Sequence, residues 1–391
     1  MVEARILFSY KASATKLLGQ CDLLLPEDTL TFDLNMAKLE AIDLFCGVGG
    51  LTCGLQQANI KVLAGVDLDQ TCRYPFETNN TSTFIHKSVK DVTGETLTPL
   101  YSEGAIKILA GCAPCQPFST YSQGNRRASD DQWALLDEFQ RLINEIEPDI
   151  ITMENVPALL KHHVFEEFVS GLRDDNVATA KYSVDYKVVA CDEYGLPQTR
   201  KRLVLLASKL GKISIKPPTY ESKTVQDVIG RFKPIGSGEA DPRDPMHRSA
   251  KLSALNLKRI RSSKPGGTWR DWPKDIISAC HKKETGNGYV SVYGRMEWDK
   301  PSPTMTTQFF GYGNGRFGHP SQDRALTLRE GAMLQSFPKS YEFVEKGSPI
   351  FMSKVGRLIG NAVPPLLGKL IGESIQMHLK TLSNHEDAIQ P

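Results

Sequence analysis

A cysteine held between two prolines is the first residue with the potential for covalent chemistry. Cys115 stands in the run Ala-Pro-Cys-Gln-Pro-Phe-Ser, with Pro114 before it and Pro117 two residues after it. Proline lacks a backbone N–H and keeps the residue before it extended, so this run is predicted to be a rigid loop. A thiol presented on such a loop is a candidate nucleophile. A redox pair of Cys112 with Cys115 and a purely structural cysteine are the alternatives.

Two further segments place charge beside apolar runs. Glu154 follows the run Pro-Asp-Ile-Ile-Thr-Met, and a carboxyl group at the buried end of a strand is costly unless it is paired or protonated. In Gln-Thr-Arg-Lys-Arg at 198–202, strand alternation puts Arg200 and Arg202 on one face and Lys201 on the other. Two guanidinium groups on one face suit a carboxylate, a phosphate or a thiolate. A helix-capping acid and a charged strand edge are the alternatives for these two segments.

A glycine-rich turn at 43–50, Asp-Leu-Phe-Cys-Gly-Val-Gly-Gly, follows another apolar run. Glycine lets the backbone turn sharply and approach a ligand. A dinucleotide fingerprint would have glycine at position 52, where this chain has Thr52, so the motif is not a clean nicotinamide site. Asp67 ends the next apolar run and is placed to accept hydrogen bonds from ribose hydroxyls. The pattern favours a nucleoside cofactor over a turn that is needed only for packing.

The elements that position these residues read as alternating strands and helices over 39–208. Five apolar runs (KLEAIDLF, KVLAGVD, AIKILAGC, PDIITMENV and RLVLLAS) are separated by helical stretches, the clearest of them at 130–147. Continuous apolar strands separated by helices predict an α/β fold, a parallel sheet with helices on both faces. Such sheets bind ligands at the carboxyl ends of their strands, where the candidate residues stand.

The character of the chain changes after residue 208. Residues 209–320 are rich in Pro, Gly, Ser and basic residues and show no sustained periodicity, while a helical pattern returns from Leu326. Five divisions are therefore expected. They are an N-terminal extension at 1–37, a catalytic and cofactor-binding domain at 38–208, a smaller irregular domain at 209–325, a segment at 326–380 whose C-terminal helix returns to the catalytic domain, and a tail at 381–391.

Composition excludes several classes of protein. Of the 391 residues, 40% are hydrophobic and 24% charged, which are ordinary globular values and argue against wholesale disorder. No apolar run approaches the ~20 residues of a membrane span, and the N-terminus lacks the features of a signal peptide. Eight cysteines without paired zinc spacings are too few for a disulfide scaffold and predict no metal site. A cytoplasmic enzyme or binding protein without membrane contact remains.

The charge is unevenly distributed along the chain. The overall formal charge is +2, but residues 211–320 contain 19 Lys and Arg against 10 Asp and Glu, and three of the four tryptophans. A segmental excess of this kind is typical of a surface that binds a polyanion. The alternative is a solvated basic surface with a few aromatic core residues.

Six segments in a fixed order resemble the cytosine-C5 methyltransferases of DNA, from about Leu39 to Gly372. The segment at 295–307 is also similar to bacterial members. The matching segments are the turn at 43–50, the Pro-Cys motif at 113–119, Glu-Asn-Val at 154–156, Gln-x-Arg-x-Arg at 198–202, Leu-Thr-Leu-Arg-Glu with Gln-Ser-Phe-Pro at 326–338, and Gly-Asn-Ala-Val-Pro at 360–364.

The resemblance implies an S-adenosylmethionine-dependent methyltransferase with a Rossmann-like sheet and a target-recognition domain at 209–325. Its substrate would be a cytosine flipped out of a specific double-stranded DNA sequence. Cys115 would add to C6 of the base, Glu154 would bind the N3 and N4 edge, and Arg200 or Arg202 would favour the thiolate. The loop at 119–132 would be a lid. The implied cofactor pocket consists of Phe45, Gly47, Gly49, Asp67, Asp91, Pro114, Leu135, Asn361 and Ala362.

The same resemblance implies the modification half of a restriction-modification system, a monomer that works independently of its restriction endonuclease and associates with the bacterial nucleoid through DNA. Three alternatives remain. They are cytosine-C5 methylation of transfer RNA, a DNA-binding protein without catalysis, and a thiol-based or nicotinamide oxidoreductase. The last is disfavoured by Thr52, and the basic segment at 211–320 favours DNA over transfer RNA.

Overall fold

A computed structural model describes residues 38–113, 134–173, 182–218, 221–286 and 288–387. The expectations for Pro114, Cys115, the loop at 119–132 and the extension at 1–37 concern residues outside these ranges. None of the helices described is long and apolar enough to cross a membrane.

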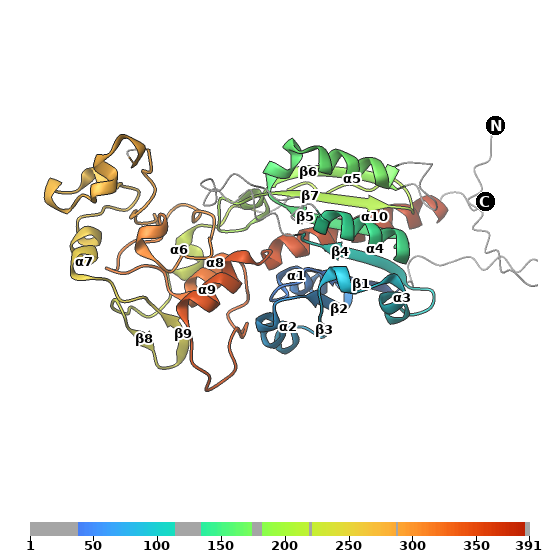
Figure 1. The fold of residues 1–391 in the computed structure, drawn as a ribbon, viewed down its shortest axis with the longest axis horizontal. Coiled ribbons are helices and arrows are strands. Elements are labelled where there is room, and N and C mark those ends of the chain that lie inside the picture. The colour runs from blue at the N-terminus through green and yellow to red at the C-terminus, as the bar shows by residue number, and fades with distance from the viewer. Residues whose placement is uncertain (1–37, 114–133, 174–181, 219–220, 287, 388–391) are drawn as a thin grey trace, which may run out of the picture. The chain divides into compact units, whose positions relative to one another are not determined.

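A mixed β-sheet of seven strands organises the first half of the chain (Figure 1). The strand order is β3-β2-β1-β4-β5-β7-β6, and β1 to β5 pair in parallel. The strands are β1 (Leu39–Leu44), β2 (Lys61–Asp67), β3 (Thr83–His86), β4 (Ile106–Gly111), β5 (Ile150–Asn155), β6 (Ser183–Ala190) and β7 (Lys201–Ser208). All five runs that the sequence analysis assigned to strands are confirmed.

The prediction of a wholly parallel sheet is wrong at one side. Strand β7 runs antiparallel to both of its neighbours, with Glu154 opposite Val204 and Asn155 opposite Leu203. The cause is the short connection from β6 to β7 through the 3-10 helix η7 (Cys191–Tyr194), because a parallel pair needs a crossover of a dozen or more residues. As a result, the first residues of β7 lie at the same edge of the sheet as the last residues of β5.

Helices cover both faces of the sheet, as the sequence predicts (Figure 1). One face packs against α4 and α5, and the other against α1 and α10. The helices of this part are α1 (Gly50–Gln57), α2 (Arg73–Asn79), α3 (Gly94–Leu97), α4 (Ala134–Ile146), α5 (His163–Arg173) and α10 (Pro365–Asp387). Helix α10 continues into the segment at 381–391 that was assigned to a tail.

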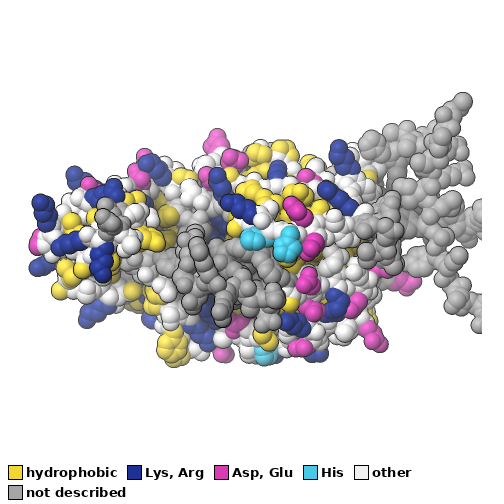
Figure 2. Space-filling view, turned by 45° about the horizontal axis from the view of Figure 1, so that its top comes forward, with side chains coloured by type: hydrophobic (Ala, Val, Ile, Leu, Met, Phe, Trp, Pro, Cys, Tyr) yellow, Lys and Arg dark blue, Asp and Glu magenta, His cyan; other side chains and the backbone are white. Residues whose placement is uncertain are grey.

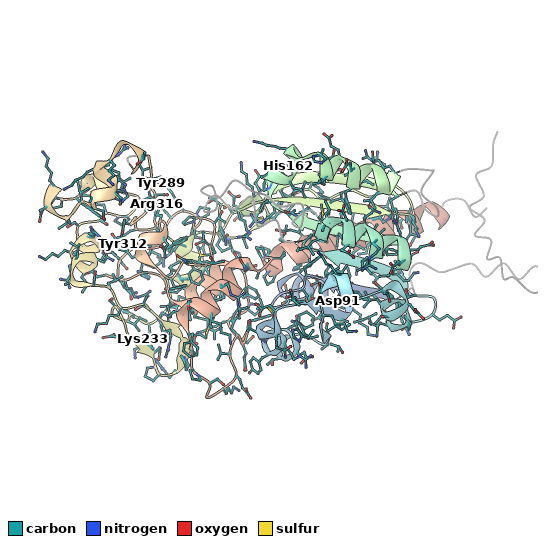
Figure 3. The ribbon with its side chains drawn as sticks, viewed as in Figure 1. Asp91, His162, Lys233, Tyr289, Tyr312 and Arg316 are labelled. Atoms are coloured by element: carbon teal, nitrogen blue, oxygen red, sulfur yellow. The ribbon has the colours of Figure 1, made fainter. Side chains whose placement is uncertain are left out.

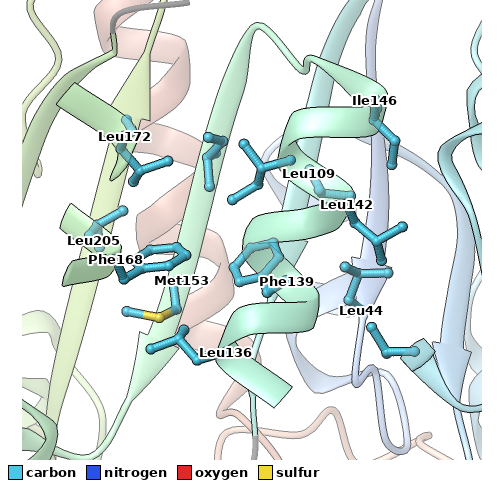
Figure 4. Packing of buried hydrophobic residues seen from close by; sticks show 14 of the residues in the cluster. Leu44, Leu109, Leu136, Phe139, Leu142, Ile146, Met153, Phe168, Leu172 and Leu205 are labelled. Carbon is cyan, nitrogen blue, oxygen red and sulfur yellow. The ribbon is translucent and has the colours of Figure 1, made fainter. Parts of the chain in front are cut away.

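Helix α4 shows how the sequence specifies this packing. Leu136, Phe139, Ile143 and Ile146 recur at helical spacing, and all four are buried against the sheet beside Leu109 (Figure 4). Phe139 has no exposed surface. Truncating a fully buried phenylalanine to alanine costs about 3–5 kcal/mol, so this stripe contributes much of the stability of the first half of the chain.

The C-terminal helix packs closely along the first helix. A Cβ atom at Gly54 of α1 would overlap the Pro365 carbonyl oxygen, and one at Gly368 of α10 would come within 2.7 Å of the Leu51 carbonyl oxygen. Glycine at these positions therefore allows the two backbones to approach. This contact places the segment that precedes α10 beside the glycine-rich turn after β1.

The remaining elements are short and surround two further clusters of buried side chains. The peptide N–H of Glu330, in α8, donates to the Thr327 hydroxyl, and the fully buried Glu330 carboxylate accepts two 2.7 Å bonds from Arg324. That ion pair fixes the start of α8 from inside the protein. The elements are α6 (Val225–Ile229), β8 (Ala240–Asp241), β9 (Asp244–Arg248), α7 (Ala254–Arg261), α8 (Leu328–Leu334) and α9 (Met352–Asn361).

Candidate active site

An acid and an arginine from neighbouring antiparallel strands meet at the carboxyl edge of the sheet. Glu154, near the end of β5, is 7% exposed, and its Oε1 lies 2.9 Å from Arg202 Nε at the start of β7. The contact is an ion pair, and Oε1 has no hydrogen bond within the described residues. The buried carboxyl group is therefore paired, which was one of the two states expected from the sequence. Of the two arginines, Arg202 is the one in contact with Glu154.

The second arginine lies deeper and carries a less compensated charge. Arg200 is 3% exposed, its Nη1 donates to the Met305 carbonyl oxygen at 3.4 Å, and its Nε has no partner among the described residues. Burial, together with the nearby charge of Arg202, lowers the pKa of Arg200 to about 9. A guanidinium group in this state favours an additional anion close to it.

The backbone that leads to Cys115 is held by the residue after Glu154. Asn155 Nδ2 donates to the Ala113 carbonyl oxygen at 3.1 Å, and Asn155 Oδ1 accepts from the N–H of Val156. Ala113 is the last residue described before the Pro-Cys motif. The amide side chain of Asn155 therefore fixes the position from which this motif departs. The sequence analysis quoted Asn155 within its motif but assigned no role to it.

The neighbouring thiol has the wrong electrostatics for a nucleophile. Burial, followed by the charge of Glu154, raises the pKa of the Cys112 thiol well above its ordinary value. Only the thiolate attacks, so Cys112 is unsuited to nucleophilic chemistry and to fast thiol exchange. This disfavours the redox pair that the sequence analysis kept open.

The glycine-rich turn binds the acid at the end of β2. Gly47 N–H donates to Asp67 Oδ2 and Asp69 N–H donates to Asp67 Oδ1, both at 2.8 Å. Phe45, Gly47 and Gly49 all have positive φ, of 58°, 52° and 86°, and for Phe45 this is a rarely populated conformation. Strained backbone of this kind is typical of ligand sites. Burial raises the pKa of Asp67, while the two N–H donors act against that rise.

The residues around this turn fit a nucleoside cofactor. Among the described residues, no atom lies within 4 Å of the position that a Cβ of Gly47 would occupy, so they leave open space beside the turn. Each carboxylate oxygen of Asp67 accepts one backbone N–H and has acceptor capacity for a second donor, so the two oxygens suit vicinal hydroxyls. Leu68, beside it, is 68% exposed, which offers apolar surface to a flat base.

The other described residues of the predicted pocket lie on three elements or directly after one of them. Asp91 ends the 3-10 helix η2 (Val89–Asp91) and has an exposed side chain (Figure 3). Leu135 is half-buried in the first turn of α4. Asn361 ends α9 with an exposed side chain, and Ala362 follows it, buried. The Gly-Asn-Ala-Val-Pro segment at 360–364 contacts the turn after β1, since a Cβ at Gly50 would overlap the Val363 carbonyl oxygen.

Two buried polar groups of the site were not identified from the sequence. Asp43 is fully buried, accepts a 2.7 Å hydrogen bond from Thr52, and has its pKa raised to about 7 by burial. Thr52 therefore has a specific partner at the position where a nicotinamide motif would have glycine. The second is the amide pair of Gln198 and Gln335, which links the segment before β7 to the residue after α8. The one sign of Asp43 in the sequence is that an acid interrupts an apolar run. No sequence pattern indicates that Gln198 and Gln335 contact each other.

Among the described residues, no three or more His, Cys, Asp or Glu side chains are arranged to hold a metal ion. The fold and the site together define an α/β enzyme that has a glycine-rich turn and a Glu–Arg pair at one edge of its sheet. The chain belongs to the family of C-5 cytosine-specific DNA methylases, whose family model matches residues 39–377. It is a methyltransferase that acts on C5 of cytosine in DNA.

Known proteins of this kind are similar over most of the chain. Type II methylase M.HgiDII of Herpetosiphon aurantiacus is 52% identical, covering 88% of this chain and 97% of that protein. Type II methyltransferase M1.BsuMI of Bacillus subtilis is 30% identical over 87% and 81% of the two chains. Among solved structures, Entamoeba histolytica methyltransferase EhMeth has a TM-score of 0.62 at 16% identity, over 88% of this chain and 99% of that one. The structural likeness supports the fold.

Proposed function

We propose that this enzyme methylates a cytosine within one specific double-stranded DNA sequence, through a covalent bond between Cys115 and C6 of the flipped-out base. The observation that carries the proposal is the contact of Glu154 with Arg202 at the sheet edge from which the Pro-Cys motif departs. An acid, a cationic group and a thiol are the groups that this reaction needs, and the first two of them meet at this edge. Cys115 itself enters the proposal from the sequence and from the family.

The chemistry begins with activation of an unreactive carbon. The Cys115 thiolate adds to C6, and the electron pair of the 5,6 double bond moves to C5, which becomes nucleophilic. Glu154 hydrogen-bonds the N3 and N4 edge and stabilises the charge that develops as sulfur adds. After methylation, loss of the C5 proton to water restores the double bond and expels the thiolate. Arg202 holds Glu154 in place, and the charge of Arg200 favours the thiolate form of Cys115.

The methyl donor in this proposal is S-adenosylmethionine, which when bound supplies an electrophilic methyl group on sulfur. Asp67 would bind the ribose hydroxyls, Phe45 would contact the adenine ring, and Gly47 and Gly49 would leave room for the methionine part. The open space beside Gly47 and the exposed Leu68 support this arrangement. The proposed remainder of the pocket is Asp91, Pro114, Leu135, Asn361 and Ala362.

Residues 209–325 would recognise the DNA sequence, and the segment at 326–380 would connect this region to the catalytic part. The basic excess at 211–320 supports contact with phosphates. Because the similar proteins M.HgiDII and M1.BsuMI are named Type II methylases, we assign the enzyme to the modification half of a restriction-modification system. It would act as a monomer, independently of its endonuclease, on nucleoid DNA in the bacterial cytoplasm.

The proposal is tested by incubating purified enzyme with labelled S-adenosylmethionine and unmethylated genomic DNA, followed by conversion sequencing. Methyl groups at C5 within one short motif would support the function and define the target. Incorporation into transfer RNA but not into DNA would contradict the proposed substrate. Binding of DNA without any methyl transfer would contradict the catalytic assignment.

A further inference from the structure

A small aromatic cluster in the basic region is built around Trp269. Its indole N–H donates to the Tyr289 carbonyl oxygen at 2.8 Å. The ring of His281 stacks on Trp269 with 4.4 Å between centroids and 8° between planes, and the Arg270 guanidinium lies 5.6 Å from the centre of the same ring. Trp269 and His281 are both buried. The cluster therefore holds the backbone of Tyr289 in a fixed place.

The side chain of Tyr289 is nevertheless directed to solvent. The side chain is 65% exposed. The backbone N–H of Tyr289 donates to the Gly286 carbonyl oxygen, and the N–H of Gly286 donates to the Lys283 carbonyl oxygen. A Cβ atom at Gly286 would overlap the Cys280 carbonyl oxygen, so this tight turn requires glycine. An aromatic ring buries 150–250 Å² when it is covered, so this exposed ring on a held backbone offers a large area to a binding partner.

The surroundings of Tyr289 are positively charged. Lys282 and Lys283, in the preceding turn, have exposed side chains. Residues 251–290 contain nine Lys and Arg against three Asp and Glu, and one of these acids, Asp271, has its carboxylate engaged by the N–H of Thr268 at 2.8 Å. Figure 2 shows many Lys and Arg side chains at the end of the protein that contains these residues. The occupant of this surface should therefore be a polyanion.

The chain that follows this turn is anchored by Arg295 and reaches a contact with Arg200. Arg295 is buried and donates to four backbone carbonyl oxygens, those of Ile260, Ser263, His319 and Gln322, at 2.6–3.1 Å. Ten residues further along, the Met305 carbonyl oxygen accepts the bond from Arg200. Figure 3 shows Tyr289 in the same part of the structure as Tyr312 and Arg316. A contact made by Tyr289 would therefore have a defined position relative to the reacting base.

We propose that Tyr289 contacts base pairs of the recognition sequence in bound duplex DNA, and that Lys282 and Lys283 bind the adjacent phosphates. The proposal rests on the DNA-methylating function proposed above and deepens it. The tyrosine ring can pack against a thymine methyl group or an unstacked base, and its hydroxyl can bond to a base edge. The lysines add affinity that does not depend on sequence.

The test uses full-length enzyme with S-adenosylhomocysteine and two fluorescent duplexes, one containing the motif mapped in genomic DNA and one with a single base pair of the motif changed. Anisotropy gives the Kd for each at several salt concentrations. Tyr289→Ala should reduce the preference for the mapped duplex by about 5- to 100-fold, and Tyr289→Phe should retain most of it. Lys282→Ala combined with Lys283→Ala should weaken both duplexes by similar factors and lower the salt slope by ~0.9 for each lost phosphate contact.

Phe351→Ala is the matched control, because Phe351 is 61% exposed but lies at the start of α9. It should change neither Kd, and all variants should bind S-adenosylhomocysteine as the wild type does, which shows that they are folded. An unchanged preference in Tyr289→Ala, with the wild type methylating its motif, would overturn this inference alone. A wild type that neither methylates nor prefers any duplex would instead contradict the proposed function.

Discussion

The side chains of Gln198 and Gln335 form a hydrogen bond of 2.7 Å, and neither of them has any exposed surface. Gln198 Oε1 also accepts the N–H of Met305 at 2.9 Å, and Gln335 Nε2 donates to the carbonyl oxygens of Ile359 and Ala362. One amide pair thus joins the segment before β7, the segment that contacts Arg200, and the end of α9 beside the glycine-rich turn. The relative positions of these three segments therefore depend on this pair.

Replacing Gln335 with methionine should therefore affect stability and activity together. Gln335→Met keeps the side-chain length but leaves the Ile359 and Ala362 carbonyl oxygens buried without their donor. An unsatisfied buried group costs about 1–3 kcal/mol, which should appear as a lower free energy of unfolding in urea. The apparent affinity for S-adenosylmethionine should fall as well, because Ala362 loses its support.

The control is Gln376→Met, since Gln376 in α10 also donates to one carbonyl oxygen, that of Ala58 at 3.0 Å, but lies away from the site. It should lose less stability and keep the wild-type kcat/KM. Equal kcat/KM in the two variants, measured per folded molecule, would show that the buried amide pair has no part in positioning the site.

The two neighbouring cysteines should behave oppositely. Cys115→Ser should abolish methylation while preserving DNA and cofactor binding, because a hydroxyl is a far weaker nucleophile toward C6. Cys112→Ser should keep most of the activity, because the raised pKa of Cys112 keeps that thiol protonated. A duplex with 5-fluorocytosine at the target blocks loss of the C5 substituent, so the covalent complex should accumulate with wild type and with Cys112→Ser. An adduct formed by Cys115→Ser would contradict the assignment.

The contact of Glu154 with Arg202 leads to a kinetic prediction. Glu154→Gln removes the charge that pairs with Arg202 and the ability to share a proton with the base, so kcat should fall by about 10²- to 10⁴-fold. Binding of S-adenosylmethionine should change little. Glu138→Gln is the control, because Glu138 forms a 2.7 Å ion pair with Arg141 on the outer side of α4. A similar kcat in the two variants would remove Glu154 from the catalytic groups.

Long apolar runs made most of the sheet predictable from the sequence. The runs ending at Leu44 and Asp67 are continuous and are bounded by glycine or acid, which is typical of strands buried on both faces. Strand β3 has four residues, and β6 alternates between half-buried and exposed residues at the sheet edge, so neither gives a strong signal. The direction of β7 depends on the length of its connection to β6, and its apolar run resembles those of the parallel strands, so hydrophobicity did not reveal that β7 is antiparallel.

The candidate site was predictable only where function constrains a short motif. Glu154 and Arg202 stand in such motifs, but their contact depends on the antiparallel direction of β7. Gln198 and Gln335 are 137 residues apart, and a buried amide has no periodicity that would mark it. The sequence could not decide which arginine approaches Glu154, because strand alternation places Arg200 and Arg202 on the same face.

Asp67 should control cofactor affinity more than the chemical step. Asp67→Asn retains an oxygen for the Gly47 N–H but replaces a charged acceptor with a neutral amide. Hydrogen bonds to charged groups contribute about 1.5–3 kcal/mol, so the Kd for S-adenosylmethionine should rise by about 10- to 150-fold in calorimetry. Asp275→Asn, which alters an exposed carboxylate, should leave this Kd unchanged. A wild-type Kd in Asp67→Asn would rule out the ribose assignment.

Stability should fall in mild acid because of His319. This residue is 1% exposed, and its Nδ1 accepts the N–H groups of Ser321 and Gln322 at 3.2 and 3.0 Å, so protonation would break both bonds. Burial, with Arg324 and Arg295 nearby, lowers the pKa of His319 to about 4. Between pH 6.5 and 4 the unfolded chain therefore binds more protons than the folded protein, and stability decreases as the pH falls through this window.

The size of this effect is bounded by the pKa shift. Each pH unit within the window can remove at most about 1.4 kcal/mol, so the wild type should lose up to about 2 kcal/mol through His319 between pH 6.5 and 5. His319→Asn keeps an acceptor near the Ser321 and Gln322 N–H groups but does not titrate. Urea unfolding at pH 6.5 and 5.0 should show a smaller pH dependence in this variant than in the wild type. Identical pH dependence would mean that other groups cause the acid sensitivity.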